Sequence, residues 1–224
     1  LSVMTLRNGA TVYIWEDKSK PDVFGMIAFK VGSVDDPEQY TGLAHYLEHV
    51  MFKGTQTIDA LDWEKEKPIY EKIIAKYDER AALSDPAARE AIDKEINDLT
   101  REAAQYAAGN EFSLLVDHMG GQGLNASTGY DQTEYHNSFP PSQLEKWLEI
   151  YSERLIDPVF RGFQTELEAV YEEYNMYNDD RGSRMREFIY EQAFGDHPYA
   201  RPIIGLPEHL KNPQLSKLID FYNT

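Results

Sequence analysis

The residues best suited to chemistry lie between positions 41 and 55, in the stretch TGLAHYLEHVMFKGT, where His45, Glu48 and His49 form the pattern H-x-x-E-H. On an α-helix, residues i and i+4 project from the same face, so His45 and His49 can bind one zinc ion. Glu48 then lies beside the metal, where it could take a proton from a zinc-bound water and pass it to a leaving amine. The pattern is typical of a hydrolytic zinc site.

A second interpretation fits the same residues equally well. An amphipathic helix with two hydrogen-bonded histidines and a solvated glutamate would carry the same pattern. The apolar positions recur at helical spacing, which predicts a helix under either interpretation; they are Leu43, Leu47, Val50 and Met51. The motif alone therefore leaves the choice open.

A zinc peptidase site needs a third protein ligand and an open fourth position. The chain has no cysteine, which excludes disulfides and thiolate ligands, so the third ligand must be a histidine or a carboxylate. In TELEAVYEEYNM, Glu166 and Glu173 lie about two helical turns apart and share one face with Val170. One of the two carboxylates could bind the metal while the other orients a histidine. Glu168 and Glu172 point elsewhere and are expected to face solvent.

The segments around the motif are predicted to contain β-strands. Residues 4–17 place an Asn8-Gly9 turn before an apolar, β-branched run, which predicts two short strands. Residues 22–33 form a further β-rich run. The motif helix, which is predicted to begin at Leu43, thus follows the strand at residues 22–33 and an intervening loop. Residues 124–139, LNASTGYDQTEYHNSF, alternate in the manner of strands.

Residues 60–108 are rich in Ala, Glu and Lys, and are predicted to form an antiparallel helical hairpin inserted into the fold. Ser84 or Asp85 can cap its second helix, and Pro86 suits the first turn. Each helix has an apolar stripe, made of Ile69, Ile73, Ile74 and Tyr77 in the first and Ile92, Ile96 and Leu99 in the second.

The C-terminal part of the chain is predicted to be helical. One helix runs from Ser142 to Asp157. Residues 163–195 form a longer helical segment, bent or interrupted at residues 178–183, NDDRGS. A short helix closes the chain. With no internal repeat and no low-complexity linker, residues 1–224 are expected to form a single domain.

Composition limits the class of protein. A hydrophobic content of 42% with 27% charged residues predicts a globular chain with a sizeable core. The net charge of −17 argues against nucleic-acid binding, which needs a surplus of Lys and Arg. The apolar runs are too short to span a membrane. No signal peptide is visible, but the chain begins at Leu1, so export is not excluded. We expect a bacterial protein, periplasmic or otherwise exported, with a cytoplasmic location as the alternative.

Several segments together resemble the pitrilysin-type inverzincins, the family of insulin-degrading enzyme and the mitochondrial processing peptidase. The segment VGSVDDPEQYTGLAHYLEHVMFKGT resembles the family signature almost throughout. LRNGATVYIWED is similar to its opening strand pair, GLNASTGYDQTEYH to a later strand, and FQTELEAVYEEYNM to its distal glutamate helix. The resemblance covers nearly the whole chain.

The resemblance assigns roles to individual residues. It implies His45 and His49 as zinc ligands, Glu48 as the general base and Glu173 as the third ligand. Glu166 falls at the position of the supporting carboxylate.

The resemblance also implies how the substrate is bound. Asn125 and Ala126 fall on a family strand that pairs with the extended backbone of a peptide substrate.

It further implies an α+β fold: a two-layer sandwich of a largely antiparallel sheet with helices packed on it, plus the inserted hairpin at 60–108. Glu173 lies 124 positions after His49, longer than is usual in the family, and removing the hairpin restores a typical spacing. Family members are larger and close related domains around the peptide. We therefore expect an N-terminal catalytic domain, incomplete at its C-terminal end, whose partners are further peptidase domains of the same chain or of another subunit.

The predicted function is zinc-dependent endopeptidase action on peptides or unfolded segments, with one Zn²⁺ per chain. The main alternative is a non-catalytic homologue that serves as a structural or substrate-presenting subunit. A metal-binding or helical interaction module that uses the 60–108 hairpin is a further alternative.

Overall fold

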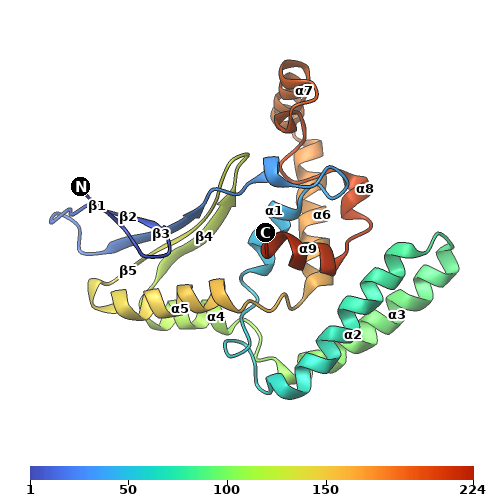
Figure 1. The fold of residues 1–224 in the computed structure, drawn as a ribbon, viewed down its shortest axis with the longest axis horizontal. Coiled ribbons are helices and arrows are strands. Elements are labelled where there is room, and N and C mark those ends of the chain that lie inside the picture. Colours follow the sequence, from blue (N-terminus) through green and yellow to red (C-terminus); the bar gives the residue numbers. More distant parts are fainter.

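The computed structural model describes residues 1–224 and contains two small antiparallel sheets (Figure 1). Strands β1 (Ser2–Thr5) and β2 (Thr11–Ile14) pair with each other. Strands β3 (Val23–Phe29), β4 (Gln122–Thr128) and β5 (Thr133–Phe139) form the other sheet in the order β3-β5-β4. The predicted α+β class with antiparallel pairing is confirmed. The strands do not form one sheet, however, because β1 and β2 pair only with each other and are almost entirely exposed.

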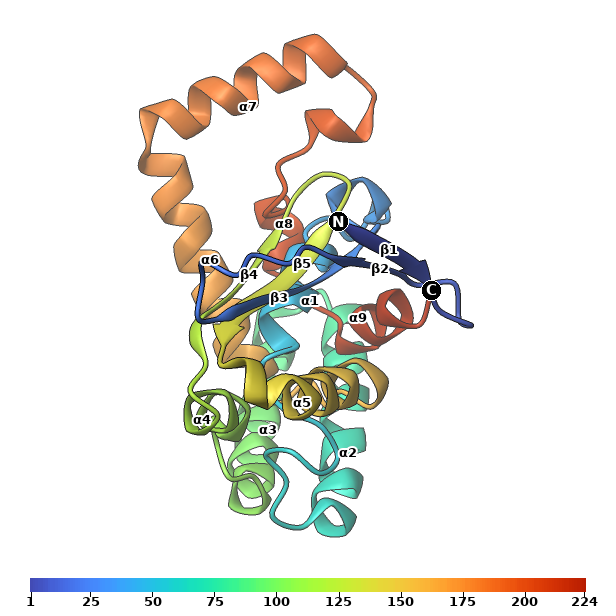
Figure 2. The same cartoon turned by 90° about the vertical axis from the view of Figure 1, so that its left-hand side faces the viewer.

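Helices α4 (Glu111–His118) and α5 (Leu144–Ile156) lie along one face of the three-stranded sheet (Figures 1 and 2). Alternate residues of β5 are buried, as expected for a strand with one covered face. Asn137 on β5 accepts hydrogen bonds from Trp147 Nε1 and Tyr151 Oη of α5, each at 2.7 Å. These bonds fix the helix on the sheet.

Arg154 of α5 is completely buried among aromatic rings. Its guanidinium carbon lies 4.5 Å from the centre of the Phe52 ring, 4.3 Å from that of Phe112 and 4.5 Å from that of Tyr135. Burial lowers the pKa of Arg154 to about 10, and the guanidinium nitrogens have no hydrogen-bond partner. Cation–π attraction therefore joins α5 to α4, to β5 and to the segment after the motif helix.

The motif helix α1 (Leu43–Val50) packs against α6 (Phe163–Asp179) and against β4. The hydroxyl of Tyr46 on α1 donates a hydrogen bond to the backbone oxygen of Phe163 at the start of α6. Helix α7 (Arg181–Phe194) follows after a break at Asp180, whose carboxylate accepts a hydrogen bond from the Ser183 N–H at 2.6 Å. The predicted interruption within residues 178–183 is confirmed, and α7 projects from the rest of the molecule (Figure 2).

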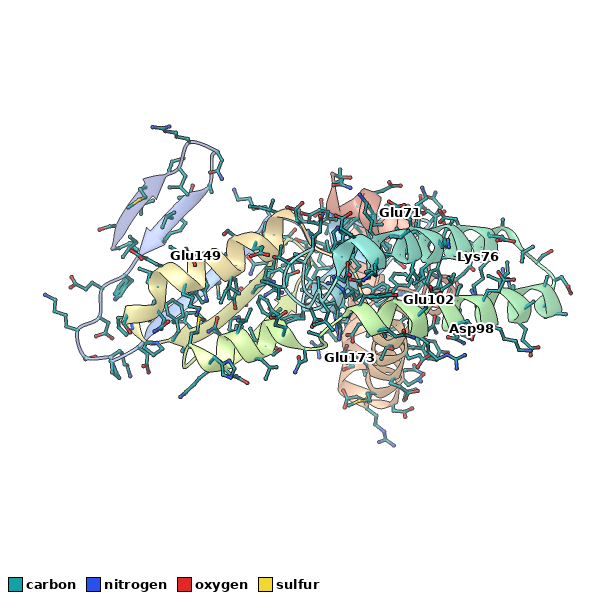
Figure 3. The ribbon with its side chains drawn as sticks, turned by 90° about the horizontal axis from the view of Figure 1, so that it is seen from below. Glu71, Lys76, Asp98, Glu102, Glu149 and Glu173 are labelled. Carbon is teal, nitrogen blue, oxygen red and sulfur yellow. The ribbon has the colours of Figure 1, made fainter.

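Helices α2 (Trp63–Ala82) and α3 (Pro86–Ala103) form the predicted hairpin, which extends as an arm. Asp85 caps α3, one of the two predicted candidates. At the root of the arm, Arg161 donates to both carboxylate oxygens of Glu66, at 2.6 and 2.8 Å. Figure 3 shows charged side chains along the arm, with Glu71, Lys76, Asp98 and Glu102 labelled.

Two further helices complete the chain, α8 (Pro207–Leu210) and α9 (Leu215–Tyr222). Helix α9 packs against α1 and α2, and buries Leu215 and Leu218. Short 3₁₀ turns occur at Ser33–Asp35, Ala104–Tyr106, Pro141–Gln143 and Pro198–Ala200. No helix combines the length and apolar character needed to cross a bilayer.

Candidate metal centre

Helix α1 presents both motif histidines to α6. Their ring centres are 4.8 Å apart. Nε2 of His45 lies 3.6 Å from Oε2 of Glu173, and Nε2 of His49 lies 3.5 Å from the same oxygen. The structure thus brings two residues of one helix together with a third that is distant in sequence.

These three residues fit a zinc ion. Ligand atoms about 2.0–2.1 Å from a tetrahedral zinc lie about 3.4 Å from each other, close to the separations of Glu173 Oε2 from the two histidine nitrogens. Glu173 Oε2 is buried and has no hydrogen-bond partner within the protein. His45, His49 and Glu173 are the only group of three or more potential ligand residues whose ligand atoms are close enough to share a metal ion. A bound metal would satisfy the orphaned carboxylate oxygen.

A second carboxylate holds His49 in place. Glu166 Oε2 lies 3.5 Å from Nδ1 of His49, and Glu166 Oε1 lies 2.6 Å from Nζ of Lys53. Burial would raise the pKa of Glu166, but its contacts with His49 and Lys53 outweigh burial and lower it. An ionised Glu166 can accept a hydrogen bond from a protonated Nδ1 of His49, which leaves Nε2 of His49 free to bind a metal.

The two histidines have opposite electrostatic environments. Burial, together with the neighbouring His49, lowers the pKa of His45 to about 3. Burial also acts to lower the pKa of His49, but the carboxylates of Glu166, Glu48 and Glu173 outweigh it and raise that pKa. The acidic groups around His49 equally favour a bound cation.

Glu48 is buried beside the two histidines, with 9% of its surface exposed. Its Oε2 accepts a hydrogen bond from the hydroxyl of Thr128 on β4 at 2.6 Å. Burial raises the pKa of Glu48, and the Thr128 hydroxyl and His49 only partly offset this effect. A raised carboxyl pKa brings a glutamate closer to the range in which general bases work.

A cleft of about 620 Å³ opens over this group. Asn125 and Ala126 of β4 line it together with His45, Glu48 and Glu173. Strand β4 pairs only with β5, so its outer edge is free to form hydrogen bonds. A register irregularity interrupts the pairing between Gln122 and Asn125.

Some site residues follow from the sequence and others do not. Glu168 and Glu172 are exposed, as expected for the outer face of α6. Lys53 and Thr128 are site residues that were not predicted from the sequence. The signal for Lys53 was available, since it follows the motif by one helical turn. Thr128 could not be found, because its hydrogen bond to Glu48 joins residues 80 positions apart.

The fold and the site together define the class of H-x-x-E-H zinc proteases, the inverzincins. The family model described as "Insulinase (Peptidase family M16)" matches residues 11–67 and 96–206. The chain therefore belongs to the insulinase family, peptidase family M16.

Individual relatives and solved structures agree with this assignment. An uncharacterized zinc protease of Mycobacterium leprae is 25% identical over 194 residues, and the zinc protease PqqE of Helicobacter pylori is 25% identical over 224 residues. The crystal structure of a protease from Helicobacter pylori superposes with a TM-score of 0.70 at 23% identity over 99% of this chain. Pitrilysin superposes with a TM-score of 0.67 at 22% identity.

The relatives are considerably longer than this chain. The alignments cover 86% of the chain but 32% of the Mycobacterium leprae protein, and 98% of the chain but 39% of PqqE. In the structural comparison the chain covers 42% of the Helicobacter pylori protease and 19% of pitrilysin. The chain thus spans between about a fifth and two fifths of the length of these proteins.

Proposed function

We propose that this chain is the catalytic domain of a zinc endopeptidase. The observation that carries the proposal is the convergence of His45 Nε2, His49 Nε2 and Glu173 Oε2, with Glu48 buried beside them. His45, His49 and Glu173 would hold one Zn²⁺, and Glu166 would orient His49. When bound, the metal would supply Lewis-acid polarisation of the scissile carbonyl and lower the pKa of the attacking water.

Glu48 is the general base of this proposal. Its carboxylate takes a proton from the attacking water and returns it to the amine of the leaving peptide. Thr128 donates to one carboxylate oxygen of Glu48, which leaves the other oxygen available for the proton. The buried position of Glu48 limits competition from bulk water.

The peptide substrate would bind along β4. Asn125 and Ala126 lie on the free edge of the sheet and line the same cleft as the metal-binding group. An extended peptide added at this edge would gain main-chain hydrogen bonds and bring one of its carbonyls to the site. This mode favours unfolded segments, because an extended chain has backbone N–H and C=O groups free for pairing, whereas most of those in a folded protein are already paired.

Further peptidase domains, in the same polypeptide or in a partner subunit, would complete the enzyme. This arrangement is supported by the greater length of the relatives, of which the chain covers 32% in one case and 39% in another. We also propose that residues 1–224 form one domain in which the arm at 60–108 is an insertion, because the family model leaves residues 68–95 unmatched. For its location we propose a bacterial periplasm or another exported site; one structural neighbour is the first half of the periplasmic protease PqqL of Escherichia coli.

The substitution Glu48→Gln in the full-length protein tests the catalytic role. We expect the variant to retain one zinc per chain by elemental analysis and to lose peptide cleavage by about 10²–10⁴-fold. Glu172→Gln, on the exposed side of α6, is the matched control and should cleave normally. Cleavage by Glu48→Gln at the rate of the parent would contradict the mechanism.

A non-catalytic homologue that presents substrate to another subunit is the alternative. It would need the cleft and the β4 edge but no base beside the metal. The buried Glu48, held by Thr128, favours the catalytic proposal. An unsubstituted full-length protein that binds zinc and peptide but never cleaves would support the alternative.

A further inference from the structure

The N-terminal turn of α1 is capped by a carboxylate from outside the helix. The first N–H groups of a helix have no partner within it. Here Asp36 Oδ2 accepts the Gly42 N–H at 2.7 Å, and Asp36 Oδ1 accepts the Ala44 N–H at 2.8 Å. Asp36 is buried, with 5% of its surface exposed. Because His45 directly follows Ala44, this cap acts at the first of the proposed metal ligands.

A distant segment, residues 201–209, holds the same turn; we call it the strap. His209 Nδ1 accepts the Thr41 N–H at 3.1 Å and lies 2.8 Å from Thr41 Oγ1. Because Nδ1 accepts a backbone N–H, it carries no proton, and the Thr41 hydroxyl donates to it. The Leu206 N–H in turn donates to Thr41 Oγ1 at 2.9 Å. The strap is therefore bonded to the residue just before the helix.

The strap also reaches Asp36. Nη2 of Arg201 donates to the backbone oxygen of Asp36 at 3.3 Å. The two ends of the loop from Asp36 to Thr41 are thus bound to the two ends of the strap, more than 160 positions away.

The backbones of the strap and the helix start are in direct contact. Gly42 has φ +88° and Gly205 has φ +93°, in the left-handed region that favours glycine. A Cβ atom on Gly42 would lie 2.6 Å from the oxygen of Ile204, and one on Gly205 would lie 2.6 Å from the oxygen of Thr41. The strap cannot come closer to the helix, and moving it away would break the bonds to His209.

The same strap faces the proposed substrate cleft. Pro202, Ile203 and Ile204 line the cleft together with His45 and Glu48. One segment thus borders the space for the peptide on one side and fixes the metal-binding helix on the other.

We propose that His209 is a positioning residue for the metal site, acting through Thr41 and the first turn of α1. It sets the depth at which α1 lies against α6, and thereby the separation of the two histidine Nε2 atoms from Glu173. His209 itself lines neither the metal group nor the cleft. This inference rests on the proposed function, since it concerns the precision of the same metal site.

The test compares two substitutions in the full-length protein. His209→Leu removes the acceptor, whereas His209→Asn keeps an acceptor oxygen near the position of Nδ1. For His209→Leu we expect zinc affinity, measured by chelator competition, to fall about 10-fold or more, as for other residues that support metal ligands. We also expect kcat to fall with KM little changed, and the visible absorption of the Co²⁺-substituted protein to change in position and intensity. His209→Asn should restore all three properties toward those of the parent.

Glu208→Gln, an exposed neighbour in α8, is the matched control and should behave as the parent. If His209→Leu fails to fold, Thr41→Val is the deciding variant. It removes the hydroxyl that bonds to His209, with little change in side-chain volume. We expect it to show the same losses of zinc affinity and kcat as His209→Leu. Parent-like zinc affinity and Co²⁺ spectrum in His209→Leu, or in Thr41→Val where the first variant does not fold, would overturn the inference. A parent protein that binds no zinc would instead refute the proposed function, so the two failures are distinguishable.

Discussion

Nδ1 of His49 and Oε2 of Glu166 lie 3.5 Å apart, across the interface between α1 and α6. This contact uses the ring nitrogen that does not face Glu173. Lys53, at 2.6 Å from the other oxygen of Glu166, keeps that carboxylate charged and in place. The proposed metal site therefore has two supporting residues, Glu166 and Lys53, behind the ligand His49.

Replacing this support should weaken metal binding without abolishing it. We expect Glu166→Gln to lower zinc affinity about 10–100-fold, because the amide holds the His49 ring less firmly and lacks the charge. Chelator competition measures the change. Glu168→Gln, on the exposed side of the same helix, should leave the affinity unchanged. Equal affinities in all three proteins would show that Glu166 does not support the site.

Removing the metal should lower the stability of the protein. A ligand at 100 times its Kd stabilises the folded state by about 2.7 kcal/mol, so zinc should raise the melting temperature of the chelator-treated protein by several degrees. His49→Ala should melt at the same temperature with and without zinc. A zinc-dependent shift of equal size in that variant would locate the binding site elsewhere.

Asp36 should make stability depend on pH. Burial raises the pKa of this carboxyl to about 7, although the N–H groups of Ala44 and Gly42 and the charge of Arg201 act to lower it. The folded state therefore binds a proton more tightly than the unfolded state, whose pKa is about 3.9. The resulting stability is present at low pH and is lost as pH rises through about 7.

The variant Asp36→Asn lacks this titration. Between pH 5.5 and 8 the free energy of unfolding of the parent should fall by about 2 kcal/mol relative to that of Asp36→Asn. Urea unfolding of both proteins at several pH values measures the difference. If the difference in the free energy of unfolding between the parent and Asp36→Asn stays constant from pH 5.5 to 8, then Asp36 titrates well below pH 5.5.

Asn137 should contribute strongly to the stability of the sheet and α5. Asn137→Ala leaves two buried donors, Trp147 Nε1 and Tyr151 Oη, without their acceptor. We expect a loss of about 2–4 kcal/mol in the free energy of unfolding, measured by urea denaturation. Adding Tyr151→Phe to that variant removes one orphaned donor, so the double variant should lose less than the sum of the two single losses. Strict additivity would exclude the proposed coupling.

The parts of the fold that could be predicted are those that depend on neighbours in sequence. The four-residue spacing of His45 and His49 predicts that they share one face of a helix. The seven-residue spacing of Glu166 and Glu173 likewise predicts a shared face of α6, the face that lies toward the two histidines. The end of α6 before Asp180 and the cap of α3 at Asp85 follow from local residue preferences.

The parts that could not be predicted depend on contacts between distant residues. Helix α4 is only eight residues long and buries two side chains, Phe112 and Val116, so its apolar periodicity is short. The division of the strands into two sheets depends on which strands pair, and residue alternation does not encode pairing. The contact between Thr41 and His209 spans 168 positions and leaves no local pattern.

Glu173 faces His45 and His49 from the far side of a long stretch of chain that includes the whole arm of α2 and α3. A metal held by these three residues would act as a cross-link that closes a very large loop. The entropy of closing such a loop grows only slowly with its length. Adding or removing residues in the arm would therefore change the entropic cost of closing this loop very little. The chain can thus vary in length between α1 and α6 while the site keeps its geometry.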